Sequence, residues 1–230
     1  MTEKPVMQSE RNQPIATVDA VVLTLEGDAL KVLLHRRPND PFMGKWALPG
    51  GYIRTESDAD ALAAIQRVLK EKTNTSGFYL EQLATFSGQD RDPRGWSVSI
   101  SYLALVPRPK LKVPDDENVM LVCVDSLPDL AFDHHQIITD ALERLRGKGA
   151  YSTLPATFLG SDFTLSDLQH AYEVVLGRSL DPSSFRRKVI TLGLVEETSN
   201  FRQVSNKRPA KVYKMRGRGR TLDRTLGQSN

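Results

Sequence analysis

The stretch from Leu48 to Asn74 most constrains the fold of this chain, because it joins a glycine turn to an amphipathic helix with an unusual set of charges. It reads LPGGYIRTESDADALAAIQRVLKEKTN. Arg67 and Glu71 lie one helical turn apart and are expected on a common face. Three apolar residues recur at helical spacing and predict a buried face: Leu62, Ile65 and Leu69. An ordinary amphipathic helix explains these apolar residues, but it explains neither the glycine pair nor the Arg-Glu spacing.

This segment resembles a Nudix box that has lost most of its metal-binding carboxylates. In that pattern, Glu side chains on one helical face hold Mg2+ through oxygen ligands, and the metal binds the pyrophosphate of the substrate. Gly50 and Gly51 keep the turn of the pattern, and Arg67 and Glu71 keep its Arg and one Glu. Four other positions depart from it: Val68 follows the Arg in place of a Glu, Lys72 replaces the second Glu of the later pair, Asn74 replaces a Gly, and Ala59 stands at the upstream Glu.

These departures predict a poor metal site. An ammonium group at Lys72 both removes a ligand and repels a divalent cation. Glu71 is therefore the only metal candidate, Mg2+ is expected to bind weakly if at all, and no cofactor is required. Other acidic residues nearby keep an active enzyme open as an alternative: Glu56, Asp58 and Asp60.

Charge is divided unevenly along the chain. Residues 1–150 contain 18 Lys and Arg against 21 Asp and Glu, whereas residues 151–230 contain 13 against 7. A length of 230 residues is sufficient for two domains. A basic C-terminal part attached to a mildly acidic domain is typical of a nucleic-acid-binding module joined to a sensor.

The composition also indicates the compartment. Cys123 is the single cysteine and lies in the apolar run MLVCV, which excludes an internal disulfide and predicts a buried structural thiol. Residues 1–13 are polar and are expected to form a flexible arm. No stretch approaches the roughly 20 apolar residues of a membrane span. We therefore expect a cytoplasmic protein with no membrane partner.

Strand and helix patterns around the glycine turn predict an α/β domain over residues 14–148. Two β-branched runs within residues 16–35 are joined at Glu26-Gly27-Asp28 and predict a hairpin. Further strands are expected at 79–87, 96–106 and 119–124, and a helix at 133–146. In the loop before the glycine turn, Phe42 and Trp46 are expected to pack on the core rather than stack on a base.

Cationic and polar residues near the glycine turn are the candidates for ligand binding. Arg91 and Arg94 lie in the turn-rich segment GQDRDPRGW, and guanidinium groups can bind phosphates through paired hydrogen bonds. At the start of a helix, His134 can hydrogen-bond a ligand, although a surface position fits the sequence equally well. The effector-binding candidates are Arg36, Arg37, Lys45, Gly50, Gly51, Arg67, Glu71, Arg91, Arg94, Trp96 and His134.

After an irregular linker at 149–160, the pattern predicts a winged helix-turn-helix domain over residues 161–216. Thr164 begins a capping-box pattern before a helix that Gly177 ends, and a second helix spans 183–192. A basic hairpin follows, in the order of domains whose second helix enters the major groove. A protein-interaction role is the alternative, but the basic residues favour phosphates. The DNA-binding candidates are Thr164, Ser183, Ser184, Arg186, Arg187, Lys188, Arg202, Lys207, Arg208 and Lys211, and residues 217–230 are expected to be a disordered tail.

Together the two halves resemble the NrtR family, the Nudix-related transcriptional regulators of NAD metabolism, over nearly the whole chain. The matching stretches are KWALPGGYI, RVLKEKT, DRDPRGWSVSISYLAL, LAFDHHQII, TLSDLQHAYEVVLG and SFRRKV. The resemblance implies an α/β Nudix-like sandwich, with a mixed sheet between helices, followed by a C-terminal winged helix-turn-helix domain. It also implies a homodimer on palindromic double-stranded operator DNA, ADP-ribose as effector, and repression of genes for NAD biosynthesis or salvage.

The DRDPRGW and AFDH stretches also resemble those of catalytic ADP-ribose pyrophosphatases of the Nudix superfamily. Carried over by position, Arg67 and Glu71 are the surviving box residues, and contacts to phosphate and ribose are expected from Arg91, Arg94 and their neighbours. Two rival functions stay open. One is an active ADP-ribose pyrophosphatase with an accessory winged-helix domain, and the other is a sugar-responsive regulator with the same architecture.

Overall fold

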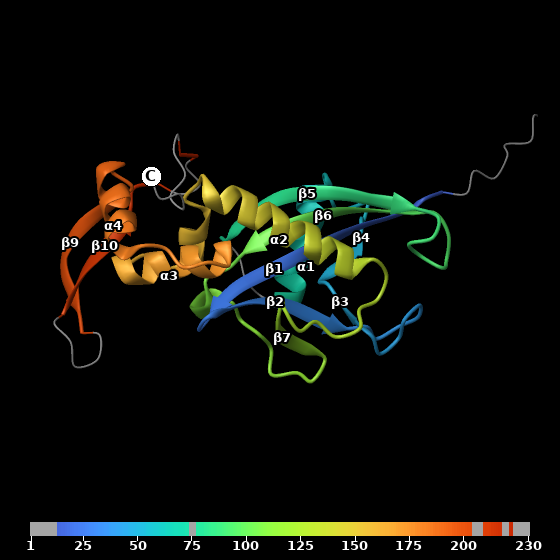
Figure 1. Cartoon of the computed structure of the whole chain (residues 1–230). Helices are drawn as coiled ribbons and strands as arrows, with labels where there is room; N and C mark the ends of the chain where they lie inside the picture. The colour runs from blue at the N-terminus through green and yellow to red at the C-terminus, as the bar shows by residue number, and fades with distance from the viewer. Residues whose placement is uncertain (1–12, 74–76, 204–208, 218–220, 223–230) are drawn as a thin grey trace, which may run out of the picture.

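The computed structural model describes residues 13–73, 77–203, 209–217 and 221–222. An N-terminal α/β part forms most of the molecule, and a smaller C-terminal part lies at one end of it (Figure 1). The expected N-terminal arm, apart from Gln13, lies outside the described residues, as do Lys207, Arg208 and most of the expected tail. None of the helices in the described ranges combines the length and apolar composition needed to cross a bilayer.

A seven-stranded mixed sheet forms the centre of the N-terminal part. Five strands follow the order β3-β2-β1-β6-β5, while β4 pairs with β1 and β7 with β2. The β1–β6 pair is parallel and the other pairs are antiparallel. The strands are β1 (Ile15–Glu26), β2 (Ala29–Arg36), β3 (Trp46–Ala47), β4 (Gly50–Tyr52), β5 (Tyr79–Gly88), β6 (Ser97–Leu105) and β7 (Val119–Cys123), and a short 3-10 helix, η1 (Arg108–Lys110), follows β6.

The sheet lies between two helices, α1 (Ala61–Thr73) and α2 (His134–Ala150) (Figure 1). Side chains of β1 alternate between the faces, so that Val21 and Leu23 join the core under α2, while Val22 joins the core under α1. Strand β1 is buried on both sides because each helix contributes an apolar face. The predicted Nudix-like sandwich with a mixed sheet is therefore confirmed.

The predicted burial of Leu62 is wrong. Its side chain is 43% exposed, whereas the core face of α1 consists of Ala64, Ile65, Val68 and Leu69. At about 100° per residue, Leu62 lies roughly 90° from the centre of that face, at its edge. Val68, which stands where the Nudix pattern has a Glu, points into the core.

Two other packing predictions have different outcomes. Trp46 packs against the core under α2, as expected. Phe42 is not part of that core and instead contacts Phe132 edge to face, at a centroid distance of 4.9 Å. Cys123 is only half-buried in β7, so the expected fully buried thiol is wrong. An alternating strand at the margin of a sheet does not enclose every apolar side chain.

The C-terminal part is a winged helix-turn-helix, as predicted. Two helices, α3 (Leu165–Leu176) and α4 (Pro182–Thr191), pack on a small sheet with the order β8-β10-β9. Its strands are β8 (Phe163–Thr164), β9 (Val195–Arg202) and β10 (Ala210–Met215). The Thr164 hydroxyl accepts a hydrogen bond from the Asp167 amide at 3.1 Å, and the Asp167 carboxylate accepts one from the Thr164 amide at 2.8 Å. This reciprocal capping box begins α3, and Gly177 in the left-handed region (φ 65°) ends it.

The segment between the two parts is ordered and packed, which corrects the expectation of an irregular linker. Helix α2 continues to Ala150, and Leu154–Phe158 form a 3-10 helix, η2, whose apolar side chains are largely buried. Apolar side chains of η2 contact the cores of both the N-terminal and the C-terminal part, so this segment is fixed in place although Gly and Ser residues lie nearby.

Helix α2 also touches α3 directly. A Cβ added to Gly149 would lie 2.8 Å from Cγ1 of Val175, so only glycine allows this approach. The Tyr172 hydroxyl donates a hydrogen bond to the Ser152 carbonyl at 2.8 Å. Val175 belongs to the same core as the α2 side of the sheet, so the apolar interior is continuous between the two parts.

Candidate ligand cavity and nucleic-acid interface

A cavity of about 300 Å³ opens beside Gly50 and Gly51, which lie in strand β4 and not in the turn expected from the sequence. This volume lies at the lower end of the range of small-molecule sites. Seven of the predicted effector residues line it: Arg36, Arg37, Gly50, Gly51, Arg91, Arg94 and His134. Four others do not line it: Lys45, Arg67, Glu71 and Trp96.

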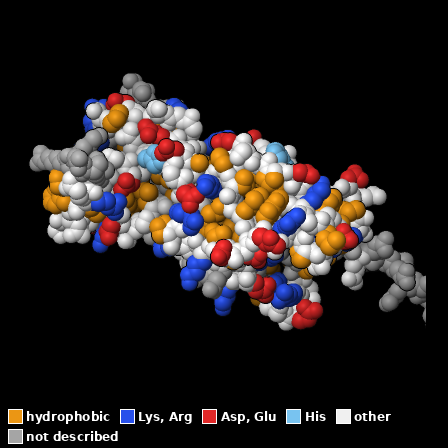
Figure 2. Space-filling view, turned by 90° about the horizontal axis from the view of Figure 1, so that it is seen from below, with side chains coloured by type: hydrophobic (Ala, Val, Ile, Leu, Met, Phe, Trp, Pro, Cys, Tyr) orange, Lys and Arg blue, Asp and Glu red, His pale blue; other side chains and the backbone are white. Residues whose placement is uncertain are grey.

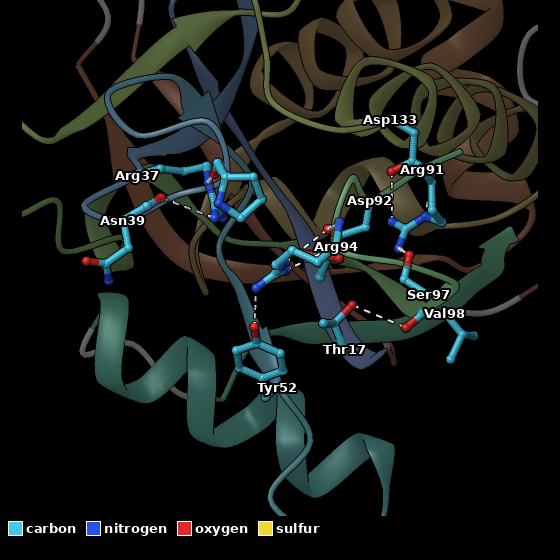
Figure 3. A network of polar contacts seen from close by, with 12 residues as sticks. Thr17, Arg37, Asn39, Tyr52, Arg91, Asp92, Arg94, Ser97, Val98 and Asp133 are labelled. Carbon is cyan, nitrogen blue, oxygen red and sulfur yellow. Dashed lines mark hydrogen bonds and ion pairs between the residues drawn. The ribbon is translucent and has the colours of Figure 1, made fainter. Parts of the chain in front are cut away.

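Arg91 positions the loop between β5 and β6 against α2. Its guanidinium donates two hydrogen bonds of 2.8 Å to the carboxylate of Asp133, the residue that precedes α2, and one of 3.2 Å to the hydroxyl of Ser97 (Figure 3). The Arg91 side chain is only 9% exposed. Most of the hydrogen-bond donors of Arg91 are thus used within the protein. Arg91 therefore holds the wall of the cavity in place and adds a positive charge to it.

Arg94 is the more accessible of the two arginines. It donates to both carboxylate oxygens of Asp92, at 3.0 and 2.6 Å, and to the hydroxyl of Tyr52 (Figure 3). Its side chain is 36% exposed, and the guanidinium lies 5.6 Å from the centroid of the Tyr52 ring. Asp92 therefore fixes an arginine at the mouth of the cavity, where it can meet an anionic ligand.

Arg37 lines the cavity from the end of β2. Its Nε donates to the Pro41 carbonyl at 2.7 Å, and its guanidinium lies 4.6 Å from the centroid of the Phe132 ring. Burial, together with the nearby charge of Arg94, lowers the pKa of Arg37. Arg37 and Arg94 repel each other, so a bound anion between them would be stabilised by both.

A buried carboxylate that the sequence analysis missed, Asp19, forms part of the cavity lining. Its Oδ2 accepts a 2.5 Å hydrogen bond from Ser99, and a Cβ added to Gly50 would lie 1.9 Å from its Oδ1. Glycine is therefore required at position 50 by the close approach of Asp19 and of the Val18 carbonyl oxygen. A charged residue inside the apolar run VDAVVL was the signal available in the sequence.

His134 is a buried residue and not a surface residue. It is 3% exposed, and its Nδ1 accepts a hydrogen bond from the Leu48 amide at 2.9 Å. Burial lowers the pKa of His134, which keeps the ring neutral with its proton on Nε2. That nitrogen is 3.7 Å from Oδ1 of Asp19. His134 thus ties the segment between β3 and β4 to α2 and can present a donor toward the cavity.

The surviving box residues form ion pairs on α1. Arg67 donates two hydrogen bonds to Asp58, at 2.8 and 2.7 Å, and this contact lowers the pKa of Asp58 to about 2. Glu71 lies 3.2 Å from a guanidinium nitrogen of Arg54 and 3.5 Å from one of Arg67. Arg67 therefore braces the loop before α1 and does not reach the cavity.

The side chains of α1 do not fit a divalent cation. Both oxygens of Glu71 face arginines, Val68 is buried, and Lys72 brings a positive charge. Within the described ranges no group of three or more His, Cys, Asp or Glu residues is arranged to hold a metal ion. Mg2+ prefers several oxygen ligands in near-octahedral geometry, which these residues cannot supply.

Two further residues of the lining, His35 and Lys72, were also missed as ligand-site candidates. Burial lowers the pKa of His35 to about 4, helped by the charge of Lys72, and its Nε2 is buried without a hydrogen-bond partner among the described residues. Burial likewise lowers the pKa of Lys72. His35 gave no signal beyond its place at a strand end, whereas Lys72 gave one through its position in the Nudix pattern.

The nucleic-acid candidates divide by exposure. Arg186 and Arg187 are exposed on α4, and Ser183 is exposed in its first turn. Ser184 and Lys188 are half-buried. The Asp181 carboxylate caps α4 by accepting from the Ser184 amide at 2.8 Å. The exposed arginines near the start of α4 have the position that reads base edges in helix-turn-helix proteins.

Thr164 and the wing have structural contacts of their own. Thr164 is 2% exposed and its hydroxyl caps α3, so its DNA contact stays a prediction. Arg202 donates to the Asp167 carboxylate at 2.9 Å and to the Asp162 carbonyl at 2.8 Å.

Lys211 lies within β10, the returning strand of the basic hairpin. It pairs with Glu197 at 3.4 Å, and its ammonium lies 4.9 Å from the centroid of the Phe201 ring. On the face shown in Figure 2, basic and acidic side chains are interspersed. The exposed α4 arginines are therefore a more specific signal of DNA binding than charge on that face.

Comparisons with known proteins match both parts. Residues 14–144 match the Nudix domain family, and residues 155–215 match the NrtR DNA-binding winged helix domain. Over 211 residues the chain is 38% identical to the ADPR responsive transcriptional repressor NtrR of Acinetobacter baylyi, covering 90% of this chain and 84% of that protein. It is 36% identical over 135 residues to the ADP-ribose pyrophosphatase of Methanocaldococcus jannaschii, covering 58% of this chain and 76% of that protein.

Solved structures agree with this assignment. The crystal structure of Shewanella oneidensis NrtR complexed with a 27mer DNA has a TM-score of 0.84 and 38% identity, covering 91% of this chain and 98% of that one. The Nudix domain of the same protein, complexed with ADP ribose, has a TM-score of 0.52 and 41% identity, covering 58% of this chain and 90% of that one.

Proposed function

The chain belongs to the NrtR family, and from this premise we propose that it is a transcriptional repressor that binds operator DNA and is released by ADP-ribose. The observation that carries the proposal is the arginine-lined cavity in a Nudix domain joined by a continuous core to a winged helix that exposes two arginines. ADP-ribose fits the chemistry of the cavity, because its pyrophosphate requires cations and its hydroxyls can bond to the carboxylate of Asp19. The relatives that respond to or bind ADP-ribose support the same ligand.

The DNA-binding form is proposed to be a homodimer on a palindromic operator in front of genes for NAD biosynthesis or salvage. Two recognition helices must then lie about one helical turn of DNA apart. ADP-ribose releases the repressor if it binds more tightly to a dimer geometry that does not match the two half-sites.

Hydrolysis of ADP-ribose is proposed to be absent or feeble, and Mg2+ is proposed to be unnecessary for binding. The geometry of α1 supports this, since Glu71 is paired with arginines and Val68 is buried. The second candidate function is an active ADP-ribose pyrophosphatase, which the archaeal relative favours. A sugar-responsive regulator of the same architecture is a weaker candidate because the cavity is lined by arginines.

One experiment separates these functions. A duplex selected by the purified protein from random-sequence DNA is labelled, and its binding is followed by fluorescence anisotropy with ADP-ribose, ribose 5-phosphate or glucose added. Release by ADP-ribose alone is expected. No effect of ADP-ribose would overturn the effector assignment, and release by glucose would favour the sugar-responsive regulator. Turnover of ADP-ribose with Mg2+ at about 1 per second or faster would establish an enzyme.

A further inference from the structure

Lys72 is a cation of the cavity that the proposed function does not yet use. It lies near the end of α1, where the Nudix pattern has a metal-binding Glu, and it lines the same cavity as Arg37 and Arg94. Neighbouring Glu71 points away from the cavity toward Arg54 and Arg67. Helical geometry thus presents an ammonium, and no carboxylate, to the ligand space at this end of α1.

The charges that line the cavity do not balance. Five cations face it, namely Arg36, Arg37, Lys72, Arg91 and Arg94, against three carboxylates, Asp19, Asp40 and Asp92, with both histidines neutral. Asp133 lies outside this lining but compensates Arg91, so that one positive charge remains in excess. This excess attracts an anionic ligand such as a pyrophosphate diester without any added cation.

Lys72 differs from the arginines in how its charge is compensated. Asp133 and Asp92 pair with Arg91 and Arg94, respectively, whereas no carboxylate of the described residues lies within ion-pair distance of the Lys72 ammonium. The Lys72 side chain is also half-buried, so water screens its charge only in part. A partly desolvated cation without a close counter-ion is unfavourable in the empty protein and is stabilised when an anion enters.

We propose that the Lys72 ammonium replaces the divalent cation of hydrolytic Nudix domains, so that the cavity binds the pyrophosphate of ADP-ribose through Lys72 without a metal. This inference rests on the proposed ADP-ribose effector and adds the residue that neutralises the phosphates. The side chains of α1 do not fit Mg2+, and the same helix supplies a fixed positive charge instead. An ammonium cannot polarise and orient water as a bound metal does, so it supports binding without providing the nucleophile for hydrolysis.

Calorimetry of ADP-ribose binding tests the proposal on the full chain, in EDTA and in Mg2+. Wild-type affinity is expected to agree within about twofold between the two buffers. Lys72→Met should weaken binding in both buffers by about 10- to 100-fold, the size of a lost charge-assisted contact. Lys70→Met, on the exposed side of the same helix, is the matched control and should change affinity less than twofold.

A second variant separates a charge role from a structural one. Lys72→Glu should bind ADP-ribose more weakly than Lys72→Met in EDTA, because a carboxylate repels the phosphates. Thermal unfolding without ligand should show Lys72→Met at least as stable as wild type, since it removes a half-buried charge without a close counter-ion.

The outcomes distinguish this proposal from the proposed function. Wild type that binds no ADP-ribose under either condition would overturn the effector itself and the Lys72 role with it. Wild type that binds only with Mg2+, or Lys72→Met that binds as tightly as wild type, would overturn the Lys72 role and leave the effector assignment standing.

Discussion

Replacing Gly50 by Ala should disrupt the cavity, and the reason is steric. A Cβ at this position would lie 1.9 Å from Oδ1 and 2.9 Å from Cγ of Asp19, and also 2.9 Å from the Val18 carbonyl oxygen. Non-bonded atoms do not approach to these distances, so Asp19 must move. Its side chain is only 9% exposed and is hydrogen-bonded to Ser99, which leaves little room for that movement.

The size of the effect follows from these contacts. Overpacking of a well-packed interior costs typically about 1–3 kcal/mol, and breaking the hydrogen bond of a buried charged group costs about 1.5–3 kcal/mol. One movement of Asp19 both relieves its part of the clash and breaks the bond, while the contact with the Val18 carbonyl oxygen remains. We therefore expect a loss of about 2–4 kcal/mol in the free energy of unfolding. The displaced carboxylate would also lie closer to the ligand, and ADP-ribose affinity should fall at least about tenfold.

The adjacent glycine provides a matched control. A Cβ at Gly51 would lie 3.3 Å from a methyl group of Val68, a contact that a small side-chain shift can relieve. Gly51→Ala should therefore cost less than about 1 kcal/mol. Urea unfolding measures the stabilities, and calorimetry measures ligand affinity.

A double variant tests the cause directly. If the new Cβ clashes with the Asp19 side chain, the double variant Gly50→Ala, Asp19→Ala should lose clearly less free energy of unfolding than the sum of the losses in the two single variants. Strict additivity, or equal losses for Gly50→Ala and Gly51→Ala, would refute the steric argument.

Four other perturbations have expected outcomes of their own. Arg187→Ala should weaken binding to operator DNA by roughly 1–3 kcal/mol more than binding to random DNA. Lys211→Ala should weaken both about equally and should lower the dependence of the binding constant on salt concentration. Anisotropy titrations at several salt concentrations measure both effects. Thr164→Ala should cost about 1 kcal/mol in urea unfolding, because it removes the capping hydroxyl of α3. His35 has a folded pKa of about 4 against 6.5 in the unfolded chain, so its unfolded form gains the proton first and stability should fall with decreasing pH. Between pH 7.5 and 5, wild type should lose about 2 kcal/mol more stability than His35→Gln. Equal losses would contradict a neutral, half-buried imidazole.

Much of the fold was predictable because its determinants are local. Alternating β-branched residues predicted β1 and β2, and the Thr164 to Asp167 spacing predicted the capping box that begins α3. Leu62 was mispredicted because a spacing rule identifies a helical face but not how far the neighbouring sheet extends along it. The η2 segment was mispredicted because its burial depends on contacts with both parts of the chain, which no local pattern contains.

The site was predictable only in part. Loop arginines such as Arg91 and Arg94 were identified because their residue type and position suggest phosphate binding. Their different roles depend on Asp133 and Asp92, and the Asp133 contact joins residues 42 positions apart in the chain. Asp19 escaped notice because a strand pattern assigns it only to a face and does not show which residue from elsewhere meets that face.

Helix α2 has a consequence for how a signal could travel. Its first turn lies beside the cavity through His134, its last turn touches α3 at Gly149, and its 17 residues span about 25 Å. A rigid rod of that length works as a lever: a tilt of about 5° at the cavity end moves the far end by roughly 2 Å. Helix shifts of about 1–2 Å at interfaces accompany known allosteric transitions. A ligand that tilts α2 by this amount through the Arg91–Asp133 pair would therefore move the end of α2 that contacts α3 by a distance comparable to those shifts.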